Sequence, residues 1–325
     1  MIQRVSDFGE TGILSLIQSL VRHDSNVQLS LGDDAAVVQS NFQHPMVMAS
    51  DAMIENTHFH RSWSSGHATA RKLVSVNCSD MAAMGAQPRY ALLTVGFPEL
   101  LEWTWVEEFC AGLAEATRLV DLPIVGGDTV GTAQDIVLSM SIVGECYTNK
   151  PMCRNGAKPG DGIYVTGPLG LSAYGLRTIL ERGEVADDSE AVLALLLGKA
   201  RLSEGRALAT WGKCHAAMDL SDGLAQDLPR LAEASDVCLQ IDLSSIPLGE
   251  DAMAVHPDLA LSLAVHGGED YELVFTASED PPLPAYRIGQ VISGSKGVIW
   301  MEGEQVFQQP PAAGPTFTHF SSKSR

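Results

Sequence analysis

The stretch RYALLTVGFPELLEWTWVEEFCAGLAEATRLVDLPIV (residues 89–125) combines a strand, a helix and a second strand. Residues 89–97 are apolar and rich in strand-forming types, which predicts a strand. Residues 102–120 carry apolar side chains at helical spacing, which predicts a helix, and Ile124 and Val125 predict a short strand after it. Intermixed strands and helices are typical of α/β or α+β domains.

The flanking sequence continues this alternation. Ile13, Leu16, Ile17, Leu20 and Val21 share one face of an opening helix, which either Ser6 or Asp7 could cap. We expect further strands at 35–39, 46–51 and 136–146 and a helix at 66–84. The strand at 136–146 is expected because its residues alternate, as seen for Val137, Ser139, Ser141 and Val143.

Residues 147–162 are rich in Pro, Gly, Asn and Lys, which predicts a boundary. We therefore expect two domains, at 1–148 and 149–325, each α/β or α+β. In the second, strands are expected at 162–166, 217–220, 237–243 and 271–276, and helices at 171–181, 189–200, 203–211 and 222–234. The last ~15 residues contain three prolines and predict an extended tail.

The charge composition argues against a nucleic-acid binder. Forty acidic against 21 basic residues give a net charge of −19, opposite to the basic stripe of a nucleic-acid binder. An acidic chain that acts on anions needs mediating cations, and divalent metals are the obvious candidates.

Apolar residues make up 45% of the chain, enough for a core, while its longest apolar run, Ala191–Leu197, is too short to span a membrane. The opening residues lack a signal peptide, so a soluble, cytoplasmic protein is expected. The six cysteines form no C-x-x-C pair and are expected as idle thiols.

Acidic residues cluster beside glycines at the ends of predicted elements. The clusters are Gly32-Asp33-Asp34, Ser50-Asp51, Ser79-Asp80, Gly126-Gly127-Asp128-Thr129, Asp219-Leu220-Ser221-Asp222-Gly223 and Gly267-Gly268-Glu269-Asp270. Glycine permits close backbone approach to a ligand, and carboxylates without His or Cys suit Mg²⁺. Singly, Asp34 or Asp222 could instead cap a helix or close a turn. Asp80 shares a predicted helix face with Leu73 and needs a partner, which is either Lys72, Arg71 or a metal.

Other chemistries have weaker signals. The sequence contains no P-loop, no G-x-G-x-x-G and no G-x-S-x-G motif. His58 and His60 could ligate a metal from a strand, or contact substrate or solvent. Arg154 could grip a phosphate or lie in a solvated loop, and Gly167-Pro168-Leu169-Gly170 could form a phosphate-facing turn.

Seven motifs in this order resemble the thiamine-monophosphate kinase family across nearly the whole chain. They are LGDDAAVV (31–38), SDAMIENTHF (50–59), NCSDMAAMGAQP (77–88), VGGDTV (125–130), RNGAKPGDGIYVTGPLG (154–170), DLSDGL (219–224) and GGEDYEL (267–273). The wider superfamily is PurM-like. The resemblance implies an N-terminal α/β domain that dimerises through its sheet, a C-terminal α+β domain, and ATP with several Mg²⁺ ions in the cleft between them.

The resemblance also implies roles for single residues. Matches to the family's magnesium ligands are Asp33, Ser50, Asp51, Asp80, Asp128, Asp219 and Asp222. Matches to ATP contacts are Gly127, Asp128, Arg154 and Ser221, and matches to thiamine-phosphate contacts are His58, Glu269 and Phe320, with Phe317 as the alternative aromatic residue. Ala49 stands where the family often has Thr, so a metal contact at that position must use the backbone.

The implied reaction transfers the γ-phosphoryl group of ATP to thiamine monophosphate. The acceptor phosphate is largely ionised near pH 7, so no general base is needed, and metal-assisted positioning carries the catalysis. The rivals are selenophosphate synthetase, the hydrogenase-maturation enzyme, the purine enzymes of the superfamily, and a non-catalytic Mg·ATP-binding regulator. The first cysteine is Cys78 and the chain ends without one, which disfavours the first two rivals, and the acids present at every metal position disfavour a regulator.

Overall fold

The computed structural model describes residues 2–20, 26–29, 37–38, 41–183, 189–255 and 257–310. The chain divides into two compact units, which are described separately below. Unit 1 comprises Met1–Met81 and Gly85–Pro151, and unit 2 comprises Ala82–Met84 and Met152–Arg325. The domain boundary at 148/149 stays a prediction. Within the described residues, no helix is both long and apolar enough to cross a membrane.

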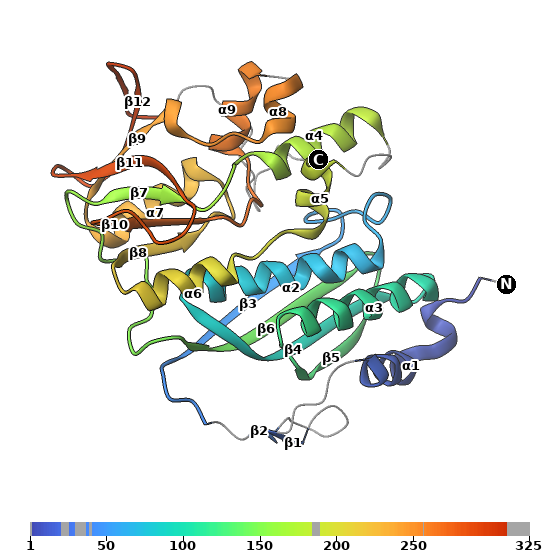
Figure 1. Cartoon of the computed structure of the whole chain (residues 1–325). Helices are drawn as coiled ribbons and strands as arrows, with labels where there is room; N and C mark the ends of the chain where they lie inside the picture. Colours follow the sequence, from blue (N-terminus) through green and yellow to red (C-terminus); the bar gives the residue numbers. More distant parts are fainter. Residues whose placement is uncertain are drawn as a thin grey trace. The chain divides into compact units, whose positions relative to one another are not determined.

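Unit 1 is built on a four-stranded sheet. Its order is β3 (Met46–Ile54), β6 (Val137–Cys146), β4 (Ala86–Pro98) and β5 (Ile124–Thr132). The helices α2 (Gly66–Ala83) and α3 (Trp103–Leu119) lie over one face of this sheet (Figure 1). The stretch 89–125 forms β4, α3 and the start of β5, with β4 and β5 parallel, as the strand–helix–strand prediction requires. However, β5 continues to Thr132, so Asp128 lies within a strand.

The two faces of this sheet differ in burial. Along β6, Leu138, Met140 and Ile142 are at most 1% exposed beneath the helices. Ser139 and Ser141 alternate with them and point to the other face, which confirms the predicted period of two. Helices α2 and α3 approach closely, because a Cβ at Gly112 would lie 2.4 Å from the His67 carbonyl oxygen.

The chain opens with α1 (Val5–Leu20), which is kinked at Gly9. Ile13 and Ile17 are buried, as predicted, whereas Leu20 is exposed. The predicted caps need a correction: Ser6 and Asp7 lie inside the helix, and Asp7 Oδ2 accepts the Arg4 N–H at 2.8 Å, so the carboxylate reaches back to the helix start. β1 (Val27–Leu29) and β2 (Val37–Val38) then pair antiparallel.

Unit 2 contains a seven-stranded mixed sheet. Its order is β13 (Gln305–Phe307), β12 (Gly297–Glu302), β9 (Cys238–Asp242), β11 (Tyr286–Ile292), β7 (Gly162–Val165), β10 (Leu273–Ala277) and β8 (Cys214–Asp219). Only β12 and β9 are parallel among the described strands of this sheet. Its helices are α4 (Leu171–Arg182), α5 (Glu190–Leu197), α6 (Leu202–Trp211), α7 (Leu224–Ser235), α8 (Glu250–Val255), α9 (Pro257–His266) and the short 3₁₀ helix η1 (Leu243–Ser245).

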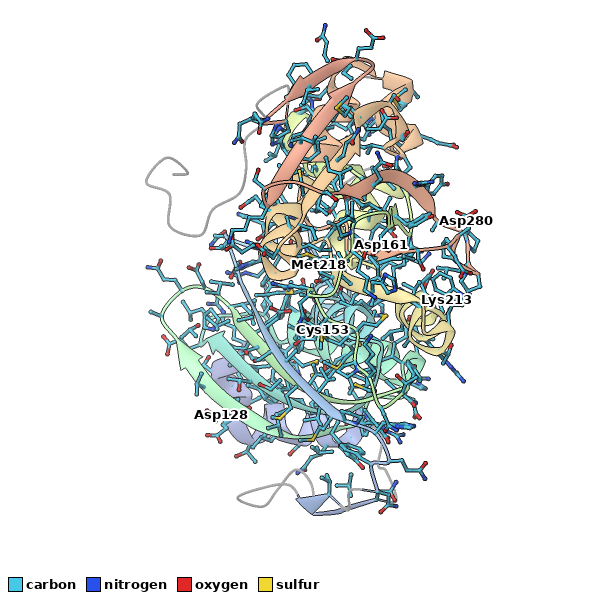
Figure 2. The ribbon with its side chains drawn as sticks, turned by 90° about the vertical axis from the view of Figure 1, so that its left-hand side faces the viewer. Asp128, Cys153, Asp161, Lys213, Met218 and Asp280 are labelled. Carbon is cyan, nitrogen blue, oxygen red and sulfur yellow. The ribbon has the colours of Figure 1, made fainter. Side chains whose placement is uncertain are left out.

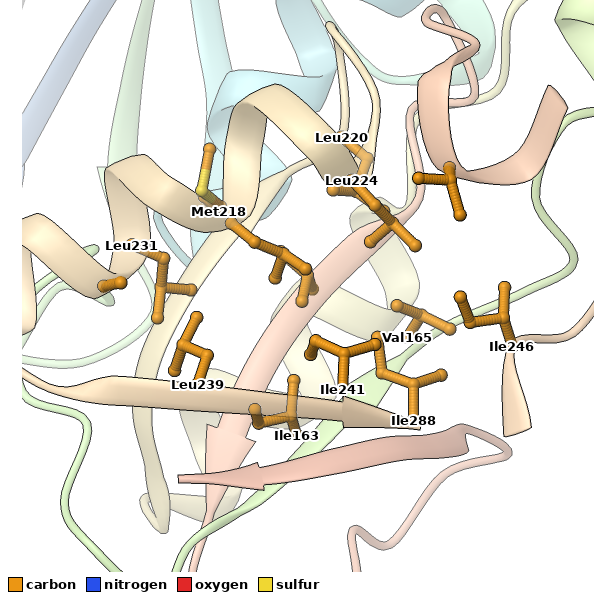
Figure 3. Close-up of a cluster of buried hydrophobic side chains, with 14 of the residues drawn as sticks. Ile163, Val165, Met218, Leu220, Leu224, Leu231, Leu239, Ile241, Ile246 and Ile288 are labelled. Carbon is orange, nitrogen blue, oxygen red and sulfur yellow. The ribbon is translucent and has the colours of Figure 1, made fainter. Parts of the chain in front are cut away.

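The core of unit 2 lies between α7 and the sheet (Figure 3). Leu224, Leu228 and Leu231 recur at helical spacing along α7 and are completely buried. They pack over inward-facing strand residues that include Ile163 and Leu239, which are also completely buried. Fully burying one such aliphatic side chain contributes about 1.5–3 kcal/mol.

Several elements differ from the sequence expectations. α7 begins at Leu224 rather than at 222, and its N-cap is Gly223, so Asp222 precedes the helix and does not cap it. Seven of the described elements were not predicted, namely β1, η1, α8, α9, β11, β12 and β13. They are short, and the two helices follow one another directly, so each stretch offers too few periods of apolar spacing to be recognised.

Candidate active site

Two loops of unit 2 lie side by side. Residues 220–223 follow β8 and residues 267–272 precede β10, and these strands are antiparallel neighbours with Asp219 opposite Leu273. Three backbone hydrogen bonds join the loops: Leu220 N–H to Glu272 O at 2.8 Å, Tyr271 N–H to Leu220 O at 2.9 Å, and Glu269 N–H to Ser221 O at 2.8 Å. We call these two segments, together with Asp219 at the end of β8, the loop pair. It brings together four predicted site residues, which are Asp219, Ser221, Asp222 and Glu269.

Glycines allow this close approach. Gly223 has φ of 94°, and a Cβ there would lie 2.4 Å from the Gly267 carbonyl oxygen. A Cβ at Gly268 would lie 2.7 Å from the Ser221 carbonyl oxygen. Glu269 and Tyr271 also have positive φ, at 66° and 51°, which is unfavourable for residues with side chains. The surrounding contacts therefore hold this backbone in a strained shape.

Charged partners fix the first loop. Arg230 on α7 donates from Nη2 to Asp222 Oδ2 and from Nη1 to Asp227 Oδ1, both at 2.6 Å. Asp227 is completely buried and also accepts the Asp222 N–H at 2.9 Å. Burial, with the nearby Asp222 and Asp219 charges, raises the pKa of Asp227 to about 6 despite that hydrogen bond and Arg230. Neither Arg230 nor Asp227 belongs to the predicted site residues, although their i, i+3 spacing on a predicted helix indicates an ion pair.

In unit 1, Asp51 and Asp80 lie on elements that a buried amide connects. Asn77 on α2 is completely buried and accepts the Asp51 N–H on β3 at 3.2 Å. Asp51 is in register with the buried Met140, so it faces the helix-covered side of the sheet. Asp80 lies one turn beyond Asn77 and is half-buried. It is therefore more exposed than Leu73, which is completely buried and with which it was predicted to share a helix face. Of its two predicted cationic partners, Arg71 pairs with Glu115 at 3.6 Å.

Ser50 and Asp128 lie on the opposite face of the same sheet. Ser50 Oγ is 2.9 Å from Ser141 Oγ. Asp128 is in register with Thr94, and through it with Ser139, on the face away from Met140. Asp128 is exposed, and its Oδ1 accepts the Thr129 N–H at 2.9 Å (Figure 2). The structure therefore does not gather Asp51 and Asp128 within unit 1.

The preceding residue, Gly127, has φ of 155° and lies against β4. A Cβ at this position would lie 1.7 Å from the Leu93 carbonyl oxygen. No other residue type fits there without displacing the strand. The glycine in this motif is thus required by strand packing, whatever ligand it contacts.

His58 is held in one tautomer. Its Nδ1 accepts the Ile54 N–H at 3.0 Å, so its Nε2 carries the proton when the ring is neutral and can donate to an anion. His60 instead bonds locally, with Nδ1 2.7 Å from Ser62 Oγ. The two rings therefore differ, and the structure gives no support to a shared metal site.

Two predicted phosphate contacts lie elsewhere in unit 2. Arg154 is exposed, and its carbonyl accepts the Ser235 hydroxyl at 2.8 Å. The turn Gly167–Gly170 precedes α4, but a carboxylate of the protein lies at that helix start. Asp270 Oδ2 accepts the Gly170 N–H at 2.8 Å and Oδ1 accepts the Ser172 N–H at 3.4 Å. A side chain of the protein thus already accepts the N–H groups that a phosphate would need. The hypothesis that this turn faces a phosphate is therefore not supported.

Within the described residues, no three His, Cys, Asp or Glu side chains form a group that could hold a metal ion. Asp33, Phe317 and Phe320 lie outside the described residues. The donors that the sequence singled out are nevertheless carboxylate and hydroxyl oxygens, the chemistry that Mg²⁺ prefers. All six cysteines lie in the described residues and are thiols rather than disulfides, and burial raises the pKa of both Cys78 and Cys110 to about 12.

The chain matches two family models. Residues 32–146 match the AIR synthase related protein N-terminal domain, and residues 158–302 match the corresponding C-terminal domain. Thiamine-monophosphate kinase of Escherichia coli K12 is 36% identical over 316 residues, covering 92% of this chain and 95% of that protein. The Bacillus subtilis enzyme is 33% identical over 298 residues, covering 87% and 91%.

Solved structures agree with these matches. Thiamine-monophosphate kinase from Stenotrophomonas maltophilia has a TM-score of 0.79 at 30% identity, covering 90% of this chain and 96% of that chain. AaThiL complexed with AMPPCP and TMP has a TM-score of 0.73 at 32% identity, covering 92% and 95%. The hydrogenase maturation protein HypE of E. coli shares the fold, with a TM-score of 0.73 at 19% identity, covering 93% and 98%. The chain belongs to the thiamine-monophosphate kinase family.

Proposed function

We propose that this protein transfers the γ-phosphoryl group of ATP to thiamine monophosphate, forming thiamine diphosphate and ADP. The observation that carries the proposal is the loop pair of unit 2, in which backbone hydrogen bonds bring the chain segments of Asp219, Ser221, Asp222 and Glu269 together at a strained, glycine-dependent turn. The names of the relatives and the bound molecules of AaThiL support the same substrates.

The transfer is direct and in line. An oxygen of the acceptor phosphate forms the new bond to the γ-phosphorus while the β–γ bridging bond breaks and ADP leaves. Because the acceptor is already mostly ionised near pH 7, no side chain needs to remove a proton. The protein's task is to bring two anions together and to hold them in position.

Carboxylates would serve this task through Mg²⁺. We propose Asp33, Ser50, Asp51, Asp80 and Asp128 from the first part of the chain and Asp219 and Asp222 from unit 2 as ligands of several Mg²⁺ ions, with Asp51 on one face of the unit 1 sheet and Ser50 and Asp128 on the other serving different ions. When bound, Mg²⁺ neutralises phosphate charge and orients the oxygens. Arg230 holds Asp222 by an ion pair, so the Asp222 carboxylate has a fixed orientation before any cation arrives.

The remaining residues would orient the two substrates. We propose Gly127, Asp128, Arg154 and Ser221 as ATP contacts, and His58, Glu269 and Phe320 as contacts to thiamine monophosphate. His58 donates through Nε2 because Nδ1 is engaged by the backbone. The Glu269 carboxylate, projecting from its strained backbone, suits the cationic thiazolium of thiamine.

The first test is an end-point assay with ATP, Mg²⁺ and thiamine monophosphate, in which thiamine species and adenine nucleotides are separated by chromatography. Thiamine replaces the monophosphate in a parallel control reaction. We expect thiamine diphosphate and ADP to rise in equal amounts only with the monophosphate. Folded, metal-replete protein that forms no thiamine diphosphate would refute the proposal.

We also propose that the protein is a homodimer joined through the unit 1 sheet. The face away from α2 and α3 carries exposed apolar side chains on neighbouring strands, among them Met48 (69% exposed), Leu92 (47%) and Val130 (44%). The same face also carries the polar Ser50, Ser141 and Asp128, and exposed apolar side chains among polar ones are typical of a protein interface. A second copy supplies an equally apolar face, as a two-fold interface requires.

Light scattering after gel filtration tests the dimer. Leu92→Lys places a charge in the apolar face and should convert dimer to monomer. Leu119→Lys changes an equally apolar residue that is 71% exposed at the end of α3, and should leave the dimer intact. A wild-type monomer at micromolar concentration would contradict the proposal.

We also propose a cytoplasmic location. Six cysteines that form no disulfide fit a reducing compartment.

A further inference from the structure

Asp270 joins two segments of unit 2 that are distant in sequence. It lies between Glu269 and Tyr271, the two residues with strained positive φ, and its carboxylate reaches the first turn of α4. Both of its oxygens accept backbone N–H groups there, from Gly170 at 2.8 Å and from Ser172 at 3.4 Å. A carboxylate at a helix N-terminus satisfies donors that have no partner within the helix.

The start of α4 is a rigid attachment point. Gly170 has φ of 83°, and a Cβ there would lie 2.7 Å from the Ala264 nitrogen of α9. A Cβ at Gly267, just after α9, would lie 2.4 Å from the Leu263 carbonyl oxygen and 2.5 Å from Ala173 Cβ. Helix α9 and the start of α4 therefore pack backbone to backbone, and neither can shift to follow a relaxing loop.

The two loops of the loop pair are anchored to different helices. They share three bonds, in which Leu220, Tyr271 and Glu269 donate their N–H groups across the pair. Beyond these shared bonds, the first loop is anchored to α7 through the Asp222 N–H and Asp227 Oδ2, a contact that does not involve Asp270. The second loop is tied to the start of α4 through the Asp270 carboxylate.

From this geometry we propose that Asp270 is a positioning residue, which fixes the direction of the Glu269 carboxylate toward the thiamine moiety by anchoring residues 269–271 to the start of α4. This proposal rests on the proposed function. Without the anchor, Glu269 and Tyr271 relax to ordinary negative φ, and the Glu269 side chain turns away. Binding of thiamine monophosphate weakens, whereas Ser221 and the ATP contacts stay in place.

The test compares Asp270→Ala and Asp270→Asn with a matched control, Asp242→Ala. Asp242 is a half-buried carboxylate of unit 2 that caps the 3₁₀ helix η1, with Oδ1 accepting the Ser244 N–H at 3.0 Å, far in sequence from the loop pair. In Asp270→Ala we expect the KM for thiamine monophosphate to rise at least about tenfold. The KM for Mg·ATP should change less than about twofold in all three variants.

Asp270→Asn separates anchoring from charge and protects the test against misfolding. Burial raises the pKa of Asp270 to about 7, so its protonated form is populated near neutral pH and Asn is close to an isostere. Because Asn keeps an oxygen for the Gly170 N–H, the KM for thiamine monophosphate should stay within about threefold of wild type. Equal losses in the Asn and Ala variants would overturn the anchoring role.

Hydrogen exchange gives a readout that needs no substrate. The Gly170 and Ser172 amides and the 267–273 segment should exchange faster in Asp270→Ala than in wild type or Asp242→Ala. Unchanged exchange in these segments, or an equal rise in both KM values, would overturn the proposal. Wild-type protein that lacks kinase activity would refute the proposed function, and the exchange measurement would still decide whether Asp270 anchors the segment.

Discussion

The site residues of the two units are organised in different ways. In unit 2, Asp219, Ser221, Asp222 and Glu269 belong to a loop pair that backbone hydrogen bonds, glycine contacts and Arg230 hold together. In unit 1, Asp51 faces the helices, while Ser50 and Asp128 lie on the other face of the same sheet. The unit 2 residues are assembled by their own unit, and those of unit 1 are not.

This difference separates two kinds of dependence. Residues of the loop pair share contacts with the fold, so a change there should alter stability and activity together. The Asp128 carboxylate makes only a local hydrogen bond, to the Thr129 N–H, so a substitution there that keeps the size of the side chain should alter activity with little effect on stability.

Asp128→Asn should have the largest effect. We expect kcat/KM to fall about a thousandfold, or ~4 kcal/mol, because a proposed metal ligand is lost. The urea midpoint should not move, since the side chain makes only a local hydrogen bond and Asn keeps its size and an oxygen that can accept it. Asp121→Asn is the control: it changes another exposed acid of unit 1, whose φ of 56° Asn tolerates, and should keep full activity. Full activity in Asp128→Asn would remove this residue from the metal set.

Gly223→Ala should break the loop pair. Gly160 offers a matched control, because its φ of 99° is close to the 94° of Gly223 but nothing lies within 4 Å of where its Cβ would stand. Both variants suffer the backbone strain of about 1–2 kcal/mol, and only Gly223→Ala also meets the Gly267 carbonyl oxygen at 2.4 Å. We expect about 3 kcal/mol of destabilisation for Gly223→Ala from urea unfolding, with loss of activity. Equal destabilisation in the two variants would show that the close approach is unimportant.

The sequence predicted the repetitive parts of the fold better than the short ones. The helical spacing of Leu224, Leu228 and Leu231 indicates α7. The alternation of Leu138, Met140 and Ile142 with polar residues indicates β6. The element α9 is missed because its apolar spacing covers few turns. The extension of β5 through Gly126 and Gly127 is missed because glycines disfavour strands, and only pairing with β4 stabilises it.

The site could be predicted in part. The motifs identify Asp219, Ser221 and Glu269, which the structure brings together in the loop pair. The predicted strand at 46–51 places Ser50 and Asp51 on opposite faces, but the motifs could not predict which of the two faces the helices, since that depends on pairing with β6. They include Asp270 but not its contact with the start of α4, and they do not include Arg230, whose role depends on its contact with Asp222.

Arg230→Met removes the ion pairs that hold Asp222 of the first loop and the buried Asp227. It leaves the buried Asp227 without its cationic partner, and we expect about 2 kcal/mol of destabilisation in urea unfolding. Arg177→Met is a matched control: its side chain is 40% exposed, against 43% for Arg230, but its partner Glu181 is 54% exposed. An exposed pair of this kind contributes less than about 0.5 kcal/mol. Equal effects would mean that burial of Asp227 does not matter.

The smallest expected effect is a pH dependence of stability that Asp270 contributes. Burial raises its pKa from the usual value of an aspartate, near 3.8, to about 7, so between these values the folded state binds a proton that the unfolded state has released. Its contribution to the free energy of unfolding is therefore fully favourable below about pH 4, decreases as pH rises, and levels off above about pH 7. The slope cannot exceed about 1.4 kcal/mol per pH unit for one proton. Urea unfolding of wild type and Asp270→Asn at pH 6 and pH 7 isolates it, since all other groups cancel in the difference. We expect wild type to lose about 1 kcal/mol relative to the variant over this interval, and a difference that is independent of pH would place the pKa of Asp270 outside it.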